Sequence, residues 1–262
     1  MVFVTRIIGV VSGKGGVGKT FVAINLGLAI KDFGQETVVV DTDFTASNLG
    51  IHLGIYPYKP FTLQSVLKGL IHDISKCVYI HPTGLKIIPS SLSLERLDVK
   101  VMRLKSTLKK LTGYVIVDSP AGLDKEATTV LRACDYVIVV TNPELSAVAD
   151  AVKVIHEAQE LKKNVIGAVI NRVSTHRYQL KPHEVSVALE VPILSIIPES
   201  SDVSQSIFEK VPVVRYRPYS EPAIEIKKIA AKILDINYER PKFSRLKNIF
   251  GSKPSGHFTE FF

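Results

Sequence analysis

The amino-acid sequence contains seven short runs in which nearly every residue is apolar. Apolar and polar positions do not alternate within them, as they would in a strand that has one face in water. Such runs are typical of strands that helices cover on both faces, as in a parallel sheet. The runs lie at residues 7–12, 37–41, 85–90, 114–120, 136–143, 165–172 and 193–200.

Several segments between or after these runs carry apolar residues at helical spacing. They lie at residues 21–34, 101–111, 145–161 and 223–234. Strands that alternate with helices along a chain predict parallel strands joined by right-handed helical crossovers. We therefore expect a protein of the α/β class, with a doubly wound, mostly parallel central sheet flanked by helices.

The residues that can carry chemistry lie where the predicted strands end. The stretches DTDF, DSPAG, TNPE, INRV and IPES each close or follow one of the apolar runs. In open α/β sheets, ligands bind beyond the carboxyl ends of the strands. The sequence therefore places a candidate site at that edge of the sheet.

Composition narrows the class of protein. Among the 262 residues, Cys77 and Cys134 are the two cysteines, and their spacing indicates neither a metal site nor a redox pair. The first residues are typical of a strand rather than an export signal, and no apolar run approaches the ~20 residues that cross a membrane. We therefore expect an intracellular protein. The formal net charge of +8 favours an anionic partner without choosing among nucleotide, nucleic acid and lipid.

The stretch GKGGVGKT, residues 13–20, connects the first predicted strand to the first predicted helix. Gly13, Gly18, Lys19 and Thr20 match G-x-x-x-x-G-K-[ST], a loop whose backbone N–H groups surround phosphates at a helix N-terminus. In such a loop the lysine contacts the β- and γ-phosphates and the threonine hydroxyl contacts Mg²⁺. The stretch therefore predicts a phosphate-binding loop.

The same stretch also satisfies the G-x-G-x-x-G pattern of dinucleotide-binding loops. Asp41 and Asp43 then lie roughly where such a fold places its ribose-binding carboxylate. A dinucleotide loop has no need for the lysine and threonine that end this one, and Asp118 closes a later strand as the acid of a nucleoside triphosphatase does. These two features favour the nucleoside triphosphatase. No Asn-Lys-x-Asp stretch follows a strand, so guanine specificity is not supported.

Lys14 is a second lysine, at the start of the loop, where backbone amides already supply positive charge. If it points outward, it can reach a phosphate held by a second subunit. With this lysine, the loop resembles that of the deviant Walker-A family, a group of dimeric ATPases that includes the ParA and MinD ATPases. The resemblance covers residues 5 to about 235, because the motifs VVVDTDFTASNLG, YVIVDSPAGL, VVTNPE, VINRV and IIPES occur in the family's order.

The resemblance implies a Mg²⁺-dependent ATPase that binds ATP, releases ADP and forms a homodimer with ATP. It implies catalytic roles for Lys14, Lys19, Asp43 and Asp118, with Asp43 orienting the attacking water. It implies a metal site formed by Thr20, Asp41 and Asp118. The residues expected to contact the nucleotide are Gly13, Lys14, Gly15, Gly16, Val17, Gly18, Lys19, Thr20, Phe21, Asn48, Asn171, Pro198 and Glu199.

The residues alone leave simpler interpretations of some of these positions. Asp41 and Asp43 are also compatible with a helix N-cap and a solvated acid, and Asn171 with a turn. Phe21 departs from the family pattern, which usually has a second hydroxyl after the loop threonine. The hydroxyl's contact to the α-phosphate is then missing or replaced by a backbone group, and we expect weaker nucleotide binding than in the family. The catalytic set is complete, so we expect an active enzyme.

The C-terminal stretch KFSRLKNIFGSKPSG follows Pro241. On a helical projection, Phe243, Leu246, Ile249 and Phe250 fall on one face, with basic residues at its margins. A short helix of this kind is typical of elements that lie in a lipid interface, although an ordinary terminal helix docked on the core is the alternative. We therefore expect a P-loop ATPase domain at 1–238, a linker with an amphipathic membrane-targeting helix at 239–253, and an unassigned, flexible tail at 254–262.

This tail favours the branch of the family whose members cycle on and off membranes and place the division site or other cell-surface structures. We expect a cytoplasmic protein that associates with the inner face of the cell membrane as an ATP-bound homodimer, with a protein regulator. The main alternative is a DNA-segregation ATPase, in which the positive charge binds non-specific DNA. An iron–sulfur carrier lacks support because no paired-cysteine motif is present, and Lys14 speaks against an amide-forming synthetase.

Overall fold

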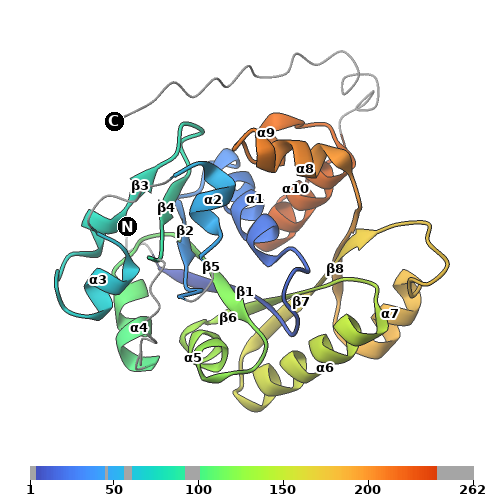
Figure 1. Cartoon of the computed structure of the whole chain (residues 1–262), viewed down its shortest axis with the longest axis horizontal. Coiled ribbons are helices and arrows are strands. Elements are labelled where there is room, and N and C mark those ends of the chain that lie inside the picture. The colour runs from blue at the N-terminus through green and yellow to red at the C-terminus, as the bar shows by residue number, and fades with distance from the viewer. Residues whose placement is uncertain (1–3, 45–46, 56–60, 92–100, 241–262) are drawn as a thin grey trace.

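In the computed structural model, residues 4–44, 47–55, 61–91 and 101–240 are described. Eight strands form one sheet in the order β3-β4-β2-β5-β1-β6-β7-β8 (Figure 1). The strands are β1 (Arg6–Ser12), β2 (Thr37–Asp41), β3 (Tyr79–Ile80), β4 (Lys86–Ile88), β5 (Tyr114–Ala121), β6 (Tyr136–Thr141), β7 (Asn164–Val173) and β8 (Ile193–Pro198).

The sheet is parallel except at one edge. β1 lies at its centre and pairs in parallel with β5 on one side and β6 on the other. Within the described residues, the short strand β3 alone runs antiparallel, against β4. The predicted fold class, α/β with a doubly wound and mostly parallel sheet, is therefore confirmed.

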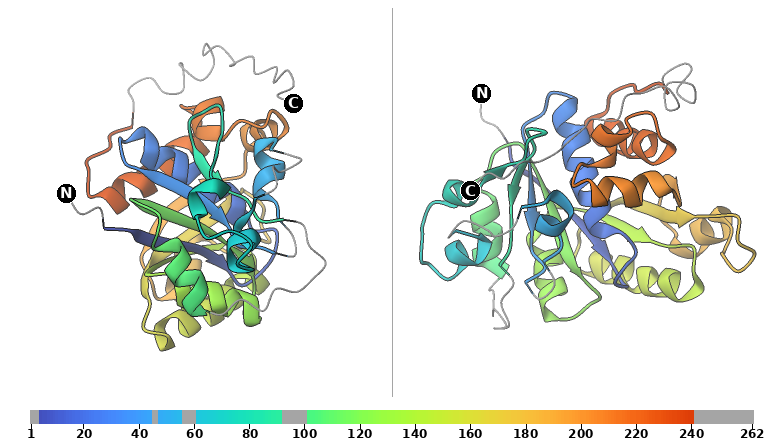
Figure 2. Two further views of the ribbon diagram at one scale, coloured as in Figure 1. Left: turned by 90° about the vertical axis from the view of Figure 1, so that its left-hand side faces the viewer. Right: turned by 45° about the horizontal axis from the view of Figure 1, so that its top comes forward.

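Helices cover both faces of the sheet, as Figures 1 and 2 show. α1 and α10 pack together on one face, and α5 and α6 lie on the other. The longer helices are α1 (Lys19–Asp32), α4 (Val101–Leu108), α5 (Lys125–Ala133), α6 (Leu145–Glu160), α7 (Pro182–Leu189), α8 (Ser201–Phe208) and α10 (Glu221–Leu234). The shorter ones are α2 (Leu49–Leu53), α3 (Leu63–Leu67), α9 (Val213–Tyr216) and the 3-10 helix η1 (Ile74–Cys77).

The core lies in two layers, one on each side of the sheet. The layer beneath α1 and α10 contains apolar residues of the central strands such as Ile8, Val39 and Ile116. Strand neighbours of the opposite parity, such as Ile7 and Val115, belong to the layer on the other face. Successive side chains of a strand point to opposite faces of the sheet, and helices cover both faces. Residues of both parities are therefore buried, and the apolar runs are continuous.

The sequence prediction was wrong in detail at several elements. The run at 85–90 forms strand only at Lys86–Ile88, and α1 begins at Lys19, two residues before the predicted start, because the loop leads directly into the helix. β3, α5, α7 and α8 were not predicted. None of the helices that the structure describes is long and apolar enough to span a bilayer. The predicted membrane helix, within 239–253, and the tail at 254–262 lie almost wholly outside the described residues.

Candidate functional site

The glycine loop between β1 and α1 adopts a conformation that needs glycine. Gly16 has a φ of 78° and Gly18 a φ of 98°, a region that residues with a side chain rarely adopt. A Cβ on Gly18 would also stand 2.2 Å from Nδ2 of Asn171. The loop therefore places its backbone N–H groups at the N-terminus of α1, where they can bind an anion.

Hydrogen bonds to β7, to β1 and to the segment after β5 hold this loop in place. The Asn171 side chain, from β7, donates a hydrogen bond to the Val17 carbonyl (2.7 Å). The Ser12 hydroxyl donates to the Lys14 carbonyl (2.8 Å), and the Gly122 N–H donates to the Ser12 carbonyl (2.8 Å). The strand end that leads into the loop is thus tied to the segment that follows β5.

Two carboxylates lie side by side at the carboxyl edge of the sheet. Asp41 ends β2 and pairs in register with Asp118 of β5. Asp41 accepts hydrogen bonds from the Asp43 N–H (2.9 Å) and the Ser47 hydroxyl (2.7 Å). Asp41 therefore positions the segment that carries Asp43, in addition to any role it has near a metal ion.

Burial raises the pKa of both carboxyl groups. The pKa of Asp118 rises to about 6, mainly because of desolvation, although nearby Lys19 and a hydrogen bond with Thr20 act in the opposite direction. The pKa of Asp41 is raised by desolvation and by the negative charge of Asp118. Two buried acids without a full set of compensating cations form an environment that favours an added positive charge.

The residues at this edge fit a magnesium ion. Oδ1 of Asp118 is buried and has no hydrogen-bond partner among the described residues. Thr20 is hydrogen-bonded to the same carboxylate, so hydroxyl and carboxylate oxygens, the ligands that Mg²⁺ prefers, lie together. Within the described residues there is no cluster of three or more acidic, histidine or cysteine side chains that could hold a metal. Mg²⁺ would therefore be bound here by few protein ligands together with water and phosphate oxygens, as is usual for this ion.

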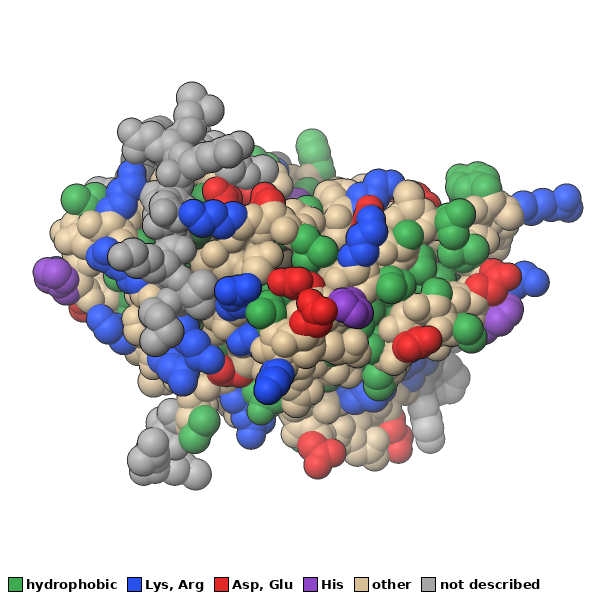
Figure 3. Space-filling model, turned by 90° about the horizontal axis from the view of Figure 1, so that it is seen from below, with side chains coloured by type: hydrophobic (Ala, Val, Ile, Leu, Met, Phe, Trp, Pro, Cys, Tyr) green, Lys and Arg blue, Asp and Glu red, His purple; other side chains and the backbone are tan. Residues whose placement is uncertain are grey.

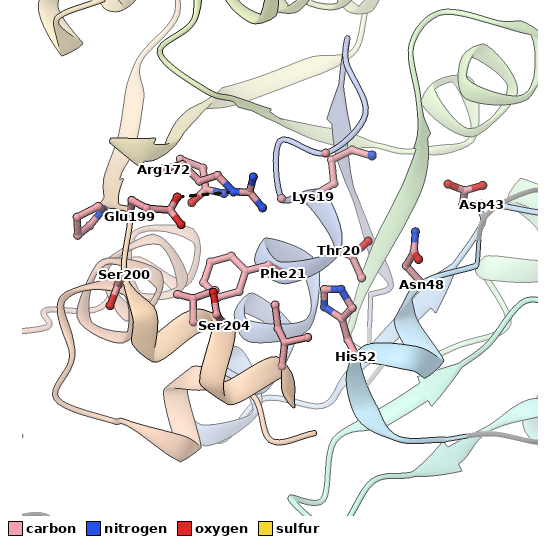
Figure 4. Close-up of a pocket in the computed structure, with 16 residues that line it drawn as sticks. Lys19, Thr20, Phe21, Asp43, Asn48, His52, Arg172, Glu199, Ser200 and Ser204 are labelled. Carbon is pink, nitrogen blue, oxygen red and sulfur yellow. Dashed lines mark ion pairs between the residues drawn. The ribbon is translucent and has the colours of Figure 1, made fainter. Parts of the chain in front are cut away.

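A cavity of about 300 Å³ extends from the loop to the end of β8 (Figure 4). Ten of the residues predicted to contact the nucleotide or to act in catalysis line it: Gly16, Gly18, Lys19, Thr20, Phe21, Asp43, Asn48, Asn171, Pro198 and Glu199. Gly13, Lys14, Gly15, Val17, Asp41 and Asp118 are not among its lining residues. The structure therefore brings most of the predicted site together around one cavity.

At the end of the cavity farthest from Lys19, Pro198 and Glu199 offer no free backbone donor. Pro198 has no N–H, and the Glu199 N–H donates to the Val173 carbonyl (2.9 Å). At these two positions the backbone can contact a base through carbonyl oxygens only. Arg172, at a positive φ of 58°, forms an ion pair with Glu199 (Nε to Oε2, 3.8 Å) and also lines this end (Figure 4).

Lys14 points away from the cavity that Lys19 lines. Its Nζ lies 3.4 Å from Oε2 of Glu144 and 3.1 Å from Oγ of Ser146, at the start of α6. The side chains of Lys14 and Glu144 are 44% and 47% exposed, so this ion pair contributes little to stability, on the order of 0–1 kcal/mol. Lys14 can therefore leave this position at small cost.

Six residues that line the cavity were not predicted: His52, Arg172, Ser200, Val203, Ser204 and Ile207. Arg172 and Ser200 directly follow predicted site residues, so the motif INRV and the motif IPES contained a signal for both. The other four come from α2 and α8, which the hydrophobic pattern did not predict.

Comparisons with known proteins agree with this geometry. The model of the CobQ/CobB/MinD/ParA nucleotide binding domain matches residues 8–213. An uncharacterised ATP-binding protein of Methanocaldococcus jannaschii is 37% identical over 250 residues, which cover 94% of each chain.

Two solved structures are also similar. The cell division ATPase MinD of Pyrococcus furiosus superposes with a TM-score of 0.81 at 32% identity, covering 88% of this chain and 98% of that one. The septum site-determining protein MinD of Pyrococcus horikoshii, solved with Mg-ADP, has a TM-score of 0.81 at 31% identity, covering 87% and 96%.

Proposed function

Because this chain belongs to the MinD/ParA family of ATPases, which use ATP with Mg²⁺, we propose that it is a nucleotide-controlled switch that dimerises with ATP and resides on a membrane. In this proposal, hydrolysis returns the dimer to a monomer that leaves the membrane. The protein is then cytoplasmic and peripheral on the inner face of the cell membrane, where it helps to place the division site or other cell-surface structures.

The position of Lys14 is the observation that supports dimerisation with ATP. Lys19 already supplies the cation of the phosphate loop, while Lys14 is exposed and contacts Glu144 and Ser146 at the surface. A second lysine that does not line its own cavity is available to a phosphate in the cavity of another copy. Such a contact forms only when a triphosphate and a partner are both present, so it couples dimerisation to ATP.

The membrane part of the proposal comes from the sequence of the C-terminal segment. Phe243, Leu246, Ile249 and Phe250 share one face of a helical projection, and they lie outside the described residues. A helix of about three turns binds lipid weakly by itself, whereas two copies in one dimer gain from effective concentration. ATP would thereby control membrane residence.

One experiment separates lipid from nucleic acid as the anionic partner. Co-sedimentation with anionic liposomes is measured with ATP and with ADP, beside a shift assay with non-specific DNA at the same salt concentration. We expect the protein to pellet with liposomes in ATP and to remain in solution in ADP. DNA binding that weakens steeply with salt, together with no liposome binding in ATP, would instead support the DNA-segregation alternative, in which the net charge of +8 serves to bind DNA.

A further inference from the structure

Phe21 forms part of the wall of the nucleotide cavity next to the phosphate loop. Its side chain is 4% exposed, and its backbone is fixed because Asn25 Nδ2 donates to the Phe21 carbonyl (2.9 Å). The Asn25 Oδ1 in turn accepts from the Val214 N–H (3.2 Å), which ties α1 to α9. The phenyl ring has no polar atom, so a phosphate oxygen beside it must accept its hydrogen bond from another residue of the cavity wall.

His52 lies beside Phe21 on the same wall. It follows Asn48 by four residues in α2, and because i and i+4 share a helix face, both side chains reach the cavity. The two residues are joined by a hydrogen bond from the His52 N–H to the Asn48 carbonyl (3.0 Å). Figure 4 shows the imidazole ring near Thr20, Asn48 and Phe21. A smaller hollow behind the wall is lined by Phe21 and His52 together, so the two side chains are neighbours.

The imidazole of His52 is neutral at physiological pH. Partial burial and the positive charge of Lys210 lower its pKa to about 4. A neutral imidazole has one nitrogen that donates and one that accepts a hydrogen bond. His52 can therefore donate a hydrogen bond to a phosphate oxygen when a nucleotide is bound. When the cavity is empty, the neutral ring leaves no buried charge there.

The cavity defines the path of a bound nucleotide. The loop and Lys19 would hold the β- and γ-phosphates at one end of the cavity, and the base would extend toward Pro198 and Glu199 at the other. The α-phosphate then lies next to the first turn of α1, at Phe21. We propose that His52 donates a hydrogen bond to the α-phosphate of the bound nucleotide, in place of a donor that Phe21 cannot supply.

The hydroxyl of Ser204, on α8, also lies near Phe21 in the cavity wall and is the competing donor (Figure 4). The test compares His52→Leu, His52→Gln and Ser204→Ala by calorimetric titration with ADP. A hydrogen bond to a charged group corresponds to about a tenfold change in affinity or more. We expect His52→Leu to weaken ADP binding about tenfold, His52→Gln to retain most of the affinity and Ser204→Ala to change it less than about twofold.

A second measurement separates a direct contact from a structural role. The two diastereomers of ADP with sulfur on the α-phosphate present either oxygen or sulfur to a donor on one side. We expect the wild-type protein to prefer one diastereomer and His52→Leu to lose most of that preference. Three results would overturn the proposal. In His52→Leu, they are an equal loss of affinity for both diastereomers or an unchanged affinity for ADP. The third is a loss of ADP affinity in Ser204→Ala and not in His52→Leu. If His52→Leu does not fold, His52→Asn, which shortens the reach of the polar group, is expected to lose the same preference.

Discussion

At the scale of single residues, the site is built around a buried acid whose charge has no complete compensation. Asp118 is 2% exposed, its pKa is raised to about 6, and its Oδ1 has no partner among the described residues. A carboxyl group with a raised pKa binds its proton more tightly in the folded than in the unfolded state. The contribution of protonated Asp118 to the free energy of unfolding is therefore complete below about pH 4 and is lost as the pH rises through about 6.

This pH dependence of stability leads to a prediction for Asp118→Asn in protein free of nucleotide and metal. Because asparagine stays neutral, we expect the variant to gain about 1–3 kcal/mol in free energy of unfolding above pH 6, with a difference that shrinks toward pH 4. Urea denaturation across this pH range measures the effect, and Asp150→Asn, a partly exposed acid paired with Lys153, is the control. A variant less stable than wild type at pH 8 would contradict the argument. Stabilisation by Mg-ADP is expected to be lost in the same variant.

Lys14 makes the second prediction at this scale. Lys14→Ala removes the cation that we propose to contact the partner's triphosphate, so ATP-dependent turnover is expected to fall at least about a hundredfold. Steady-state phosphate release measures turnover, and light scattering with ATP measures the dimer. Lys153→Ala removes another exposed lysine, on α6, and is expected to leave both unchanged. Turnover at the wild-type level in Lys14→Ala would rule out the role.

At the scale of elements, the position of α1 determines the position of the phosphate loop. Gly27, in the middle of α1, faces β2 so closely that a Cβ would stand 2.3 Å from Cγ2 of Val39. In an exposed helix, replacing glycine by alanine stabilises by about 1 kcal/mol. At Gly27 the close contact makes the same replacement destabilising, because overpacking a close-packed core costs about 1–3 kcal/mol.

We therefore predict that Gly27→Ala lowers the free energy of unfolding and weakens ADP binding, because α1 moves away from β2 and takes the loop with it. Thermal denaturation and calorimetric titration measure the two effects. Val39→Ala removes the opposing methyl groups, so the double variant is expected to be more stable than the sum of the two single losses predicts. Strictly additive losses would show that the close approach is not what excludes a side chain.

The elements that the sequence predicted are those whose burial is nearly complete. The runs that form β1, β2, β5 and β6 are continuous because both faces of the strands are covered. By contrast, α8 buries little more than Ser206 and exposes Phe208 to 80%, so it has no apolar stripe to detect. A helix of five residues such as α2 is too short for periodicity to show. For this reason the motif residues of the site were predictable, whereas His52 and Ser204 were not.

At the scale of the whole molecule, the net charge of +8 can serve lipid or nucleic acid. On the face shown in Figure 3, Lys and Arg side chains are interspersed with Asp and Glu. Mixed charges produce a weaker field at a distance than a single-sign surface does, because opposite charges cancel, and salt screens what remains beyond about 10 Å. The charge alone therefore gives no reason to prefer DNA, and the apolar face of the C-terminal segment becomes the feature to test.

The last prediction compares two substitutions of equal charge in that segment. Phe250→Glu places a carboxylate on the predicted apolar face, whereas Ser244→Glu places one on the opposite face of the helical projection. If only net charge mattered, both would weaken binding to anionic liposomes equally. If the apolar face inserts into lipid, Phe250→Glu loses the burial of a large aromatic side chain, about 2 kcal/mol per copy, in addition to the charge effect. Because a dimer carries two copies, we expect Phe250→Glu to abolish ATP-dependent co-sedimentation and Ser244→Glu to retain most of it, with ATP turnover in solution unchanged in both.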